Sequence, residues 1–304
     1  MESSKGHKIA AGVGLTLAGL LAYLLLWPVP AEPVSWAPPQ ASGYVGPHAP
    51  NTRLANLQKI DIGAEQGPEH LAMGPDGKLY AAVASGKILR MAPDGSQREV
   101  FASTGGRVLG FDFDASGRLI AADAMKGLLA IAADGKVTML TAQVAPGDPI
   151  RYADGVVVAP SGMIYFTDAS TRFAPAEWGG TFEASVLDIL EQSSTGRVLA
   201  YDPSNGATRI LASGLSFANG IALSADGRTL FVNETGRYRI WKIDAQSGKR
   251  EILFDNLPGY PDNLMRGRDG KIWVGLVKPR NPTIDKLAQK PFMRKLTLRL
   301  PRAL

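Results

Sequence analysis

The sequence predicts an all-β protein, a six-bladed β-propeller, and three observations lead to this fold class. Short apolar stretches are split by Asp-Gly, Ser-Gly and Asn-Gly turns, which are strong hairpin signals. One pattern of stretch, turn and strand recurs in five segments, as in a repeat protein. Outside the two ends of the chain, no long apolar run with a 3.6-residue period separates the strands, which argues against an α/β fold.

The first element is predicted to be a transmembrane helix. Residues 9–27 form an uncharged run of 19 residues, long enough to span a bilayer. Lys5 and Lys8 precede it, so residues 1–8 are expected to be a cytoplasmic tail and the rest of the chain to lie on the periplasmic, lumenal or extracellular side. The alternative is a signal peptide cleaved after "VPA", before Glu32, although the apolar run is long for one.

Two further segments follow from composition. Residues 28–55, rich in Pro, Ala and Ser, are predicted to be a linker, and residues 56–304 the propeller domain.

Cysteine is absent, which excludes disulfides, thiolate metal sites and a cysteine nucleophile. Eight Lys or Arg face one acid between Lys278 and Arg302, so the net charge of +5 comes from this tail and predicts no nucleic-acid partner. The tail is a basic segment on an anionic membrane, a solvated basic helix or a stretch in a crossover loop.

Each of the five repeats is built around a two-residue turn. The turns are Asp76–Gly77, Ser116–Gly117, Ser161–Gly162, Asp226–Gly227 and Asp269–Gly270. Successive turns are 40, 45, 65 and 43 residues apart, and the spacing of 65 contains an insertion near residues 172–196. Most repeats continue into a second hairpin, so each holds four short strands, the content of one propeller blade.

The position seven residues before each turn carries a side-chain oxygen in four of the five repeats. The five residues are Glu69, Leu109, Asp154, Asn219 and Asp262. The innermost strand of a propeller blade lines the central channel, so equivalent positions of different blades are expected to converge. Taken singly, each acid could equally well have a structural role and not be a metal ligand. It would then cap a turn or accept hydrogen bonds from the main-chain amides at the start of a strand.

Converging carboxylates repel each other and are costly to desolvate, and a bound cation removes both penalties. We therefore predict a metal site. Its ligands are Glu69, Asp154, Asn219, Asp262 and Asn263. Because all donors are oxygens, Ca²⁺ is favoured, with Mn²⁺, Mg²⁺ and Zn²⁺ as alternatives.

The same region resembles a known family. The resemblance is carried by "GPEHLA", "YADGVVVAPSGMIYFTDAST", "GLSFANGIALSADGRTLFVNET" and "GYPDNLMRGRDGKIWVGL". These segments look like the strictosidine synthase-like family, which includes the adipocyte plasma membrane-associated proteins and belongs to the gluconolactonase (regucalcin) and paraoxonase superfamily. The resemblance covers residues 55–300 and implies a six-bladed propeller with a catalytic divalent cation in its channel.

The resemblance also implies roles for single residues. Glu69 is similar to the first-blade glutamate, Asn219 to the asparagine of an "ANG" motif, and Asp262–Asn263 to the acid–amide pair of paraoxonase. Asp154 stands where paraoxonase has an asparagine, so this site is more acidic.

Two features depart from the family. The paraoxonase histidine pair has no counterpart among His7, His48 and His70, and strand alternation predicts that His70 packs away from the channel. A sixth repeat is not visible before Leu304, so either the sequence is truncated in the last blade or the stretch "NLQKIDI" helps to close the propeller. The catalytic glutamate of strictosidine synthase lies on the last blade and is not located here.

Three functions stay open. The resemblance favours a metal-dependent hydrolase of small-molecule esters or lactones, an arylesterase or gluconolactonase type, with Asp262 as general base and Asp154 as second choice. The first alternative is a strictosidine synthase-type condensation of an amine with an aldehyde, which uses a carboxylate and no metal. The second is a membrane-tethered binding propeller with a structural cation. No Gly-x-Ser-x-Gly motif supports a serine nucleophile.

Other polar and aromatic residues receive structural interpretations. Asp123 and Asp168 end second strands and are predicted to bond main-chain groups in the adjoining turns. Tyr152 and Phe217 lie two positions before predicted ligands and either line a substrate cup or pack in the core, the latter being favoured. The insertion at 172–196 is predicted to cover the channel mouth and to influence substrate choice.

Overall fold

The computed structural model describes residues 2–267 and 269–300, and the chain divides into two compact units. The larger unit consists of Pro39–Ile189 and Ser194–Arg280. The smaller unit combines the two end segments, up to Pro38 and from Asn281 onward, with Leu190–Ser193. The larger unit holds all the predicted site residues.

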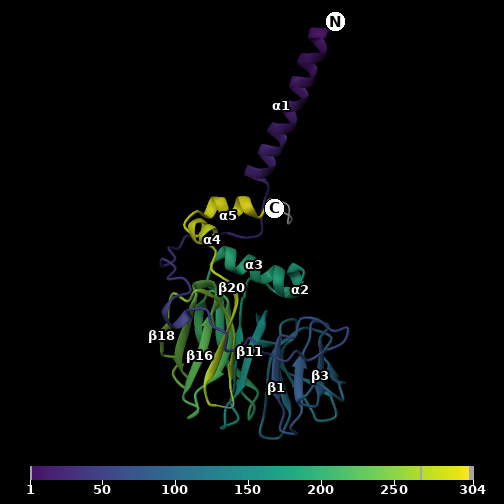
Figure 1. Cartoon of the computed structure of the whole chain (residues 1–304), viewed down its shortest axis with the longest axis vertical. Helices are drawn as coiled ribbons and strands as arrows, with labels where there is room; N and C mark the ends of the chain where they lie inside the picture. Colours follow the sequence, from purple (N-terminus) through teal and green to yellow (C-terminus); the bar gives the residue numbers. More distant parts are fainter. Residues whose placement is uncertain (1, 268, 301–304) are drawn as a thin grey trace. The chain divides into compact units, whose positions relative to one another are not determined.

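The larger unit is built from small antiparallel sheets whose strands follow chain order (Figure 1). The first sheet contains β1 (His70–Met73), β2 (Leu79–Ala82), β3 (Lys87–Met91) and β4 (Glu99–Ser103). The second contains β5 (Val108–Phe113), β6 (Leu119–Asp123), β7 (Gly127–Ile131) and β8 (Val137–Thr141). The third contains β11 (Ala153–Val158), β12 (Ile164–Asp168), β13 (Gly196–Asp202) and β14 (Ala207–Leu215). The fourth contains β15 (Ala218–Leu223), β16 (Thr229–Glu234), β17 (Arg239–Asp244) and β18 (Arg250–Phe254).

The remaining elements of this unit are two strand pairs, two 3₁₀ helices and the helices of the insertion. A fifth, two-stranded sheet pairs β19 (Gly259–Arg266) with β20 (Ile272–Pro279), and β9 (Gln143–Ala145) pairs with β10 (Asp148–Pro149). The 3₁₀ helices are η1 (Gly46–His48) and η2 (Thr235–Arg237), and the insertion forms α2 (Pro175–Trp178) and α3 (Thr181–Glu191). The all-β prediction is confirmed, and the sheets are arranged as in a propeller; the count of six blades stays a prediction.

The five predicted turns form, and the second one shows why their sequence suits them. Gly117 adopts a φ of 79°, a left-handed conformation that costs glycine little, and its N–H bonds to the carbonyl of Asp114 at 2.9 Å. The carboxylate of Asp114 accepts from the main-chain N–H groups of Ser116 and Arg118 at 3.0 and 2.9 Å. An acid, a small residue and a glycine therefore specify this turn locally.

The stretch "NLQKIDI" forms no strand in the structure. Ile60 and Ile62 instead pack against a buried cluster of the first sheet that includes Val83, Leu89 and Met91. The stretch thus packs on the first sheet without pairing as a strand, and its part in closing the propeller stays a prediction.

The first strands of successive sheets lie against one another at the site, and glycine permits this approach. β5 contacts β11, β11 contacts β15, and β15 contacts β19. A Cβ added to Gly110 would lie 2.6 Å from the carbonyl oxygen of Asp154, and one added to Gly220 would lie 2.3 Å from the main-chain nitrogen of Leu264. Each glycine directly follows one of the positions in the predicted ring.

Gly220→Ala is therefore expected to destabilise the protein by about 3 kcal/mol, because the added methyl group meets main chain that no side-chain rotation can move. Gly275→Ala on β20 is the matched control, since its Cβ would have only the carbonyl oxygen of Asn263 nearby, at 3.9 Å. Its free energy of unfolding is expected to change by less than about 1 kcal/mol. Urea denaturation measures both variants, and equal losses would contradict the proposed close approach.

The smaller unit is helical, with α1 (Glu2–Leu26), α4 (Pro282–Leu287) and α5 (Pro291–Thr297). In the part of the chain that the structure describes, no helix is both long enough and apolar enough to cross a membrane. The predicted transmembrane assignment of residues 9–27 thus has no support from the structure.

The basic tail is not solvated throughout, because two of its cations are buried; its contact with a membrane stays a prediction. Arg294 is 2% exposed and donates to the carbonyls of Leu190 at 2.6 Å and Ala288 at 2.9 Å. Arg299 is 7% exposed and donates to the carbonyl of Trp27 at 2.6 Å. These two arginines satisfy main-chain carbonyls inside the smaller unit.

Candidate functional site

Three predicted site residues lie where the first strand of a sheet is irregular. The pairing of β11, β15 and β19 with their second strands shifts register between Ala153 and Val156, between Ala218 and Ile221, and between Pro261 and Leu264. Asp154, Asn219 and Asp262 occupy these bulges. A bulge breaks the strict alternation of side chains and can re-aim them. This explains how the adjacent Asp262 and Asn263 both contact site residues of other sheets.

Direct contacts link four of the five predicted ligands. Asn219 Nδ2 donates to Asp262 Oδ1 at 2.7 Å. Asn263 Nδ2 donates to the carbonyl of Glu69 at 2.9 Å and is 3.5 Å from its Oε1. Arg107 Nη2 pairs with Glu69 Oε2 at 3.0 Å, so a cation already stands at one side of the cluster.

Charge interactions link Asp262 to Glu69, and both of these residues to Asp154. Burial raises the pKa of Glu69, the charge of Asp262 raises it further, and Arg107 opposes both. Burial, followed by the charges of Asp262 and Glu69, raises the pKa of Asp154 well above its ordinary value. Burial also raises the pKa of Asp262, against the hydrogen bond from Asn219. Residues from four sheets therefore converge, as the repeat register predicted.

The cluster is looser than a set of carboxylates bound to a metal. Among the described residues, no three acidic, histidine or cysteine side chains are close enough to hold a metal ion by themselves. A cation here would need the amide oxygens of the cluster as well. One is available, because Asn219 Oδ1 is buried and accepts no hydrogen bond from the described residues. The five ligands therefore stay a prediction. The chemistry of their oxygen donors fits a bound cation.

Arg107 was missed by the sequence analysis. It lies two residues before Leu109, the single ring position without an oxygen, and therefore at the same offset as Tyr152 and Phe217 from their ligands. Its Nη1 also donates to the carbonyl of Gly67 at 3.1 Å. A comparison of the residues two positions before each ring position would have identified Arg107.

Tyr152 and Phe217 pack in the core, as the favoured interpretation has it. Their rings meet edge to face with centroids 5.2 Å apart, and they are only 2% and 4% exposed. The Tyr152 hydroxyl donates to the carbonyl of Thr181 at 2.8 Å. Burial, and then the charges of Asp154, Glu69 and Asp188 in that order, raise its pKa. The insertion, which supplies Thr181 and Asp188, thus lies beside the site, and its influence on substrate choice stays a prediction.

The acids at the ends of second strands hold the starts of first strands. Asp123 also accepts from Met125 N in the adjoining turn at 2.9 Å, as predicted, whereas Asp168 accepts from the main-chain nitrogens of Arg151 and Tyr152 and not from the turn that follows it. A third acid, Glu234, acts in the same way. The bonds run to Asp123 from Arg107 N at 3.1 Å, to Asp168 from Tyr152 N at 2.8 Å, and to Glu234 from Ser216 N at 2.8 Å. Each bond fixes the main chain two or three residues before a ring position.

His70 packs as predicted. Its ring lies edge to face against Phe111, with centroids 4.7 Å apart. Burial lowers the pKa of His70 to about 4.

The protein should therefore lose stability as the pH falls from about 6.5 to 4, because the unfolded chain binds a proton at this histidine that the folded chain does not. The folded pKa lies below the unfolded one, so the contribution is present above pH 6.5 and is lost on acidification. The pKa difference corresponds to about 3 kcal/mol. We expect His70→Phe to remove this part of the pH dependence, measured as free energies of unfolding in urea at pH 8, 6 and 4.5. Curves for the variant and the wild type that stay parallel would contradict the assignment.

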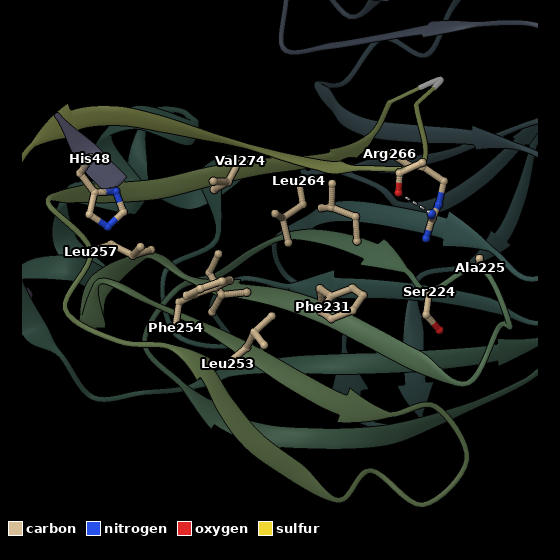
Figure 2. Close-up of a pocket in the computed structure, with 13 residues that line it drawn as sticks. His48, Ser224, Ala225, Phe231, Leu253, Phe254, Leu257, Leu264, Arg266 and Val274 are labelled. Atoms are coloured by element: carbon tan, nitrogen blue, oxygen red, sulfur yellow. Dashed lines mark hydrogen bonds between the residues drawn. The ribbon is translucent and has the colours of Figure 1, made fainter. Parts of the chain in front are cut away.

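A separate apolar pocket of about 590 Å³ lies between the fourth sheet and the pair β19–β20 (Figure 2). Phe231, Leu253 and Val274 line its middle, with His48 and Arg266 toward opposite ends. Within the described part of the chain, none of the predicted site residues and no acidic side chain lines it. This pocket is therefore not the candidate reaction site.

Comparison with known proteins gives the class of protein. Residues 79–288 match the SMP-30/Gluconolactonase/LRE-like region, and residues 46–91 match the family described as strictosidine synthase-like, N-terminal. The chain therefore belongs to the strictosidine synthase-like family of SMP-30/gluconolactonase-like propellers.

Relatives of known sequence agree. The chain is 37% identical over 250 residues to Protein STRICTOSIDINE SYNTHASE-LIKE 6 of Arabidopsis thaliana, covering 80% of this chain and 65% of that protein. It is 32% identical over 332 residues to the adipocyte plasma membrane-associated protein of Salmo salar, covering 98% of this chain and 76% of that one. The chain thus spans 65% of the length of the Arabidopsis relative.

Solved structures share the fold. A gluconolactonase of Xanthomonas campestris superposes with a TM-score of 0.56 at 22% identity, covering 69% of this chain and 70% of that one. A putative gluconolactonase superposes with a TM-score of 0.55 at 19% identity, covering 71% and 76%.

Proposed function

We propose that the protein is a divalent-metal-dependent hydrolase of small-molecule esters or lactones, built on a six-bladed propeller, with Ca²⁺ the favoured ion and Mn²⁺, Mg²⁺ or Zn²⁺ as alternatives. One observation carries the proposal. Three carboxylates with raised pKa values, the buried Asp154 and the half-buried Glu69 and Asp262, belong to the same cluster as a buried amide oxygen of Asn219 that has no partner among the described residues. Such a donor set is unfavourable without a cation and suits a hard one. The gluconolactonases of similar fold support lactones as the substrate class.

The residues present fit an oxygen-ligated cation. The ligands would be Glu69, Asp154, Asn219, Asp262 and Asn263. When bound, the ion would polarise a substrate carbonyl and stabilise the negative charge that develops on its oxygen. Arg107 holds one oxygen of Glu69, which leaves the other oxygen of that carboxylate for the cation.

The chain's own groups supply proton transfer and charge. Asn219 donates to one oxygen of Asp262 and so orients the carboxylate, which leaves its second oxygen to take a proton from water as a general base. The raised pKa of Asp262 suits this role, since it brings the basicity of the carboxylate nearer to neutral pH. The Arg107 guanidinium adds positive charge to the side of the cluster where the carboxylates repel each other.

The proposal is tested on the full chain with phenyl acetate and a panel of lactones, with Ca²⁺ added and with EDTA. We expect hydrolysis that EDTA abolishes and Ca²⁺ restores, and calorimetry should show one bound ion. Hydrolysis unaffected by EDTA would exclude the metal. Tight Ca²⁺ binding without hydrolysis of any substrate would favour the propeller as a binding module with a structural cation.

A strictosidine synthase-type condensation is the second candidate, because one observation favours it. Asp154 is 4% exposed and its pKa is raised well above its ordinary value, as a general acid that keeps its proton requires. The test is condensation of an aromatic amine with an aldehyde in EDTA. Turnover there, lost in Asp154→Asn, would replace the hydrolase proposal.

A further inference from the structure

Side chains of one sheet hold main-chain carbonyls of site residues in the next sheet. Thr167 Oγ1 of β12 donates to the carbonyl of Asn219 at 2.7 Å. Asn233 Nδ2 of β16 donates to the carbonyl of Asp262 at 2.6 Å. Asn263 repeats the arrangement toward Glu69 in the first sheet. Three of the predicted ligands are thus held by their carbonyls from the neighbouring sheet.

Thr167 and Asn233 occupy the same position in their sheets. Each directly precedes the acid that ends the second strand, Asp168 or Glu234, and each is 0% exposed. In the second sheet this position is Ala122, which has no side-chain donor. The two residues are polar groups buried in strands, where an apolar side chain would ordinarily be favoured. The bonds to site carbonyls offset this cost for the Thr167 hydroxyl and the Asn233 Nδ2, although Asn233 Oδ1 has no partner among the described residues.

Thr167 links two bulges at once. Its hydroxyl accepts from the main-chain N–H of Gly155 at 2.8 Å while it donates to the carbonyl of Asn219. Gly155 follows Asp154 in the chain, so the hydroxyl joins the main chain beside one predicted ligand to the main chain of the next. Peptide groups in a bulge lie partly outside the ladder of hydrogen bonds, and such a link fixes their orientation.

We propose that Thr167 and Asn233 are positioning residues that set the cation affinity of the site by holding the peptide groups of Asn219 and Asp262. The inference rests on the metal site of the proposed function and not on its reaction. A Cβ direction is fixed by its own peptide groups, so rotation of a held carbonyl would move the ligating oxygen at the end of the side chain. Groups that orient metal ligands typically change affinity by about 10–100-fold when removed.

The test measures Ca²⁺ affinity of the full chain by calorimetry in matched variants. Thr167→Val keeps the shape of the side chain and removes the hydroxyl, and Thr167→Ser keeps the hydroxyl. We expect the valine variant to bind Ca²⁺ about 10-fold more weakly or worse, and the serine variant to bind within about threefold of wild type. Asn233→Leu should weaken binding by a similar factor.

The control is Thr208→Val on β14 of the same sheet. The Thr208 hydroxyl is buried and has no hydrogen-bond partner among the described residues, so the same chemical change should leave Ca²⁺ affinity unaltered. Thermal unfolding of each metal-free variant separates lost folding from lost binding.

The possible results distinguish the positioning role of Thr167 from a purely structural role and from the proposed hydrolase activity. A Thr167→Val protein that is less stable but binds Ca²⁺ like wild type would overturn the inference and make the bond merely structural. A graded loss of affinity in a protein that hydrolyses nothing would support the inference while the proposed hydrolase fails. A wild-type protein that binds none of Ca²⁺, Mn²⁺, Mg²⁺ or Zn²⁺ would overturn both.

Discussion

Asp262→Asn is expected to lower kcat/KM for ester or lactone hydrolysis by at least about a thousandfold. The residue carries two proposed roles, ligand and general base, and asparagine keeps its shape while removing its charge and basicity. Asn219 can still approach the substituted side chain, so the fold of the bulge should be preserved. The variant therefore isolates the chemistry of one carboxylate.

Raising the Ca²⁺ concentration distinguishes the two roles. If Asp262 is only a ligand, saturating Ca²⁺ should restore kcat; if it is also the base, kcat should stay low after the site is full. Asp134→Asn, a change to an exposed turn acid that accepts from the N–H of Lys136, is the control and should keep full activity. An Asp262→Asn enzyme with more than about a tenth of wild-type kcat/KM would rule out the catalytic assignment.

The turns and the register of the repeats could be predicted because they are local. An Asp, a small residue and a Gly fix the turn at Gly117 through bonds within five residues, so a short window of sequence contains the information. Once the turns were placed, counting back a constant number of residues brought Glu69, Asp154 and Asp262 into one cluster. Because the repeats share one register, the local turn signals predict which residues far apart in the sequence lie together.

The details of the site depend on contacts that the repeat does not encode. The Arg107–Glu69 pair joins residues 38 positions apart, and no arginine stands at the place equivalent to Arg107 in the third or fourth sheet, which carry Tyr152 and Phe217 there. The bonds from Thr167 and Asn233 depend on bulges, which shift the register by one residue and leave no mark in the pattern of apolar residues. The burial of Arg294 and Arg299 in the smaller unit is likewise invisible in composition, because a charged tail is ordinarily solvated.

A buried ion pair joins Arg197 to Asp168 of β12, the strand that pairs with β11. The Arg197 side chain is 5% exposed, and its Nε bonds to Asp168 Oδ2 at 2.9 Å. Its Nη1 contacts both oxygens of Asp148, at 2.7 and 2.9 Å, and its Nη2 donates to the carbonyl of Pro149 at 2.8 Å. Asp168 is 0% exposed, and it holds the N–H of Tyr152 two residues before the predicted ligand on β11.

Arg197→Met is expected to lower the free energy of unfolding by about 3–5 kcal/mol at pH 7, because it leaves the carboxylate of Asp168 buried without its countercharge. Burial already raises the pKa of Asp168, and the charge of Arg197 is the largest effect opposing it. Without that charge the pKa should rise further, so the protonated form becomes accessible at mildly acidic pH. The deficit of the variant relative to wild type should therefore shrink as the pH falls.

Urea unfolding at pH 7 and pH 5 tests both parts of this expectation against Arg118→Met. Arg118 pairs with Asp114 at 2.8 Å, but its side chain is 46% exposed, so water replaces the lost partner and the cost should stay below about 1 kcal/mol. Similar losses in the two variants would show that burial does not govern the Arg197 pair. A deficit for Arg197→Met that is unchanged between the two pH values would show that Asp168 stays charged without its partner, and that other groups compensate it. If the deficit instead shrinks as the pH falls, the Arg197 guanidinium is the group that keeps Asp168 charged. It would thereby support β11 and the position of Asp154 on that strand.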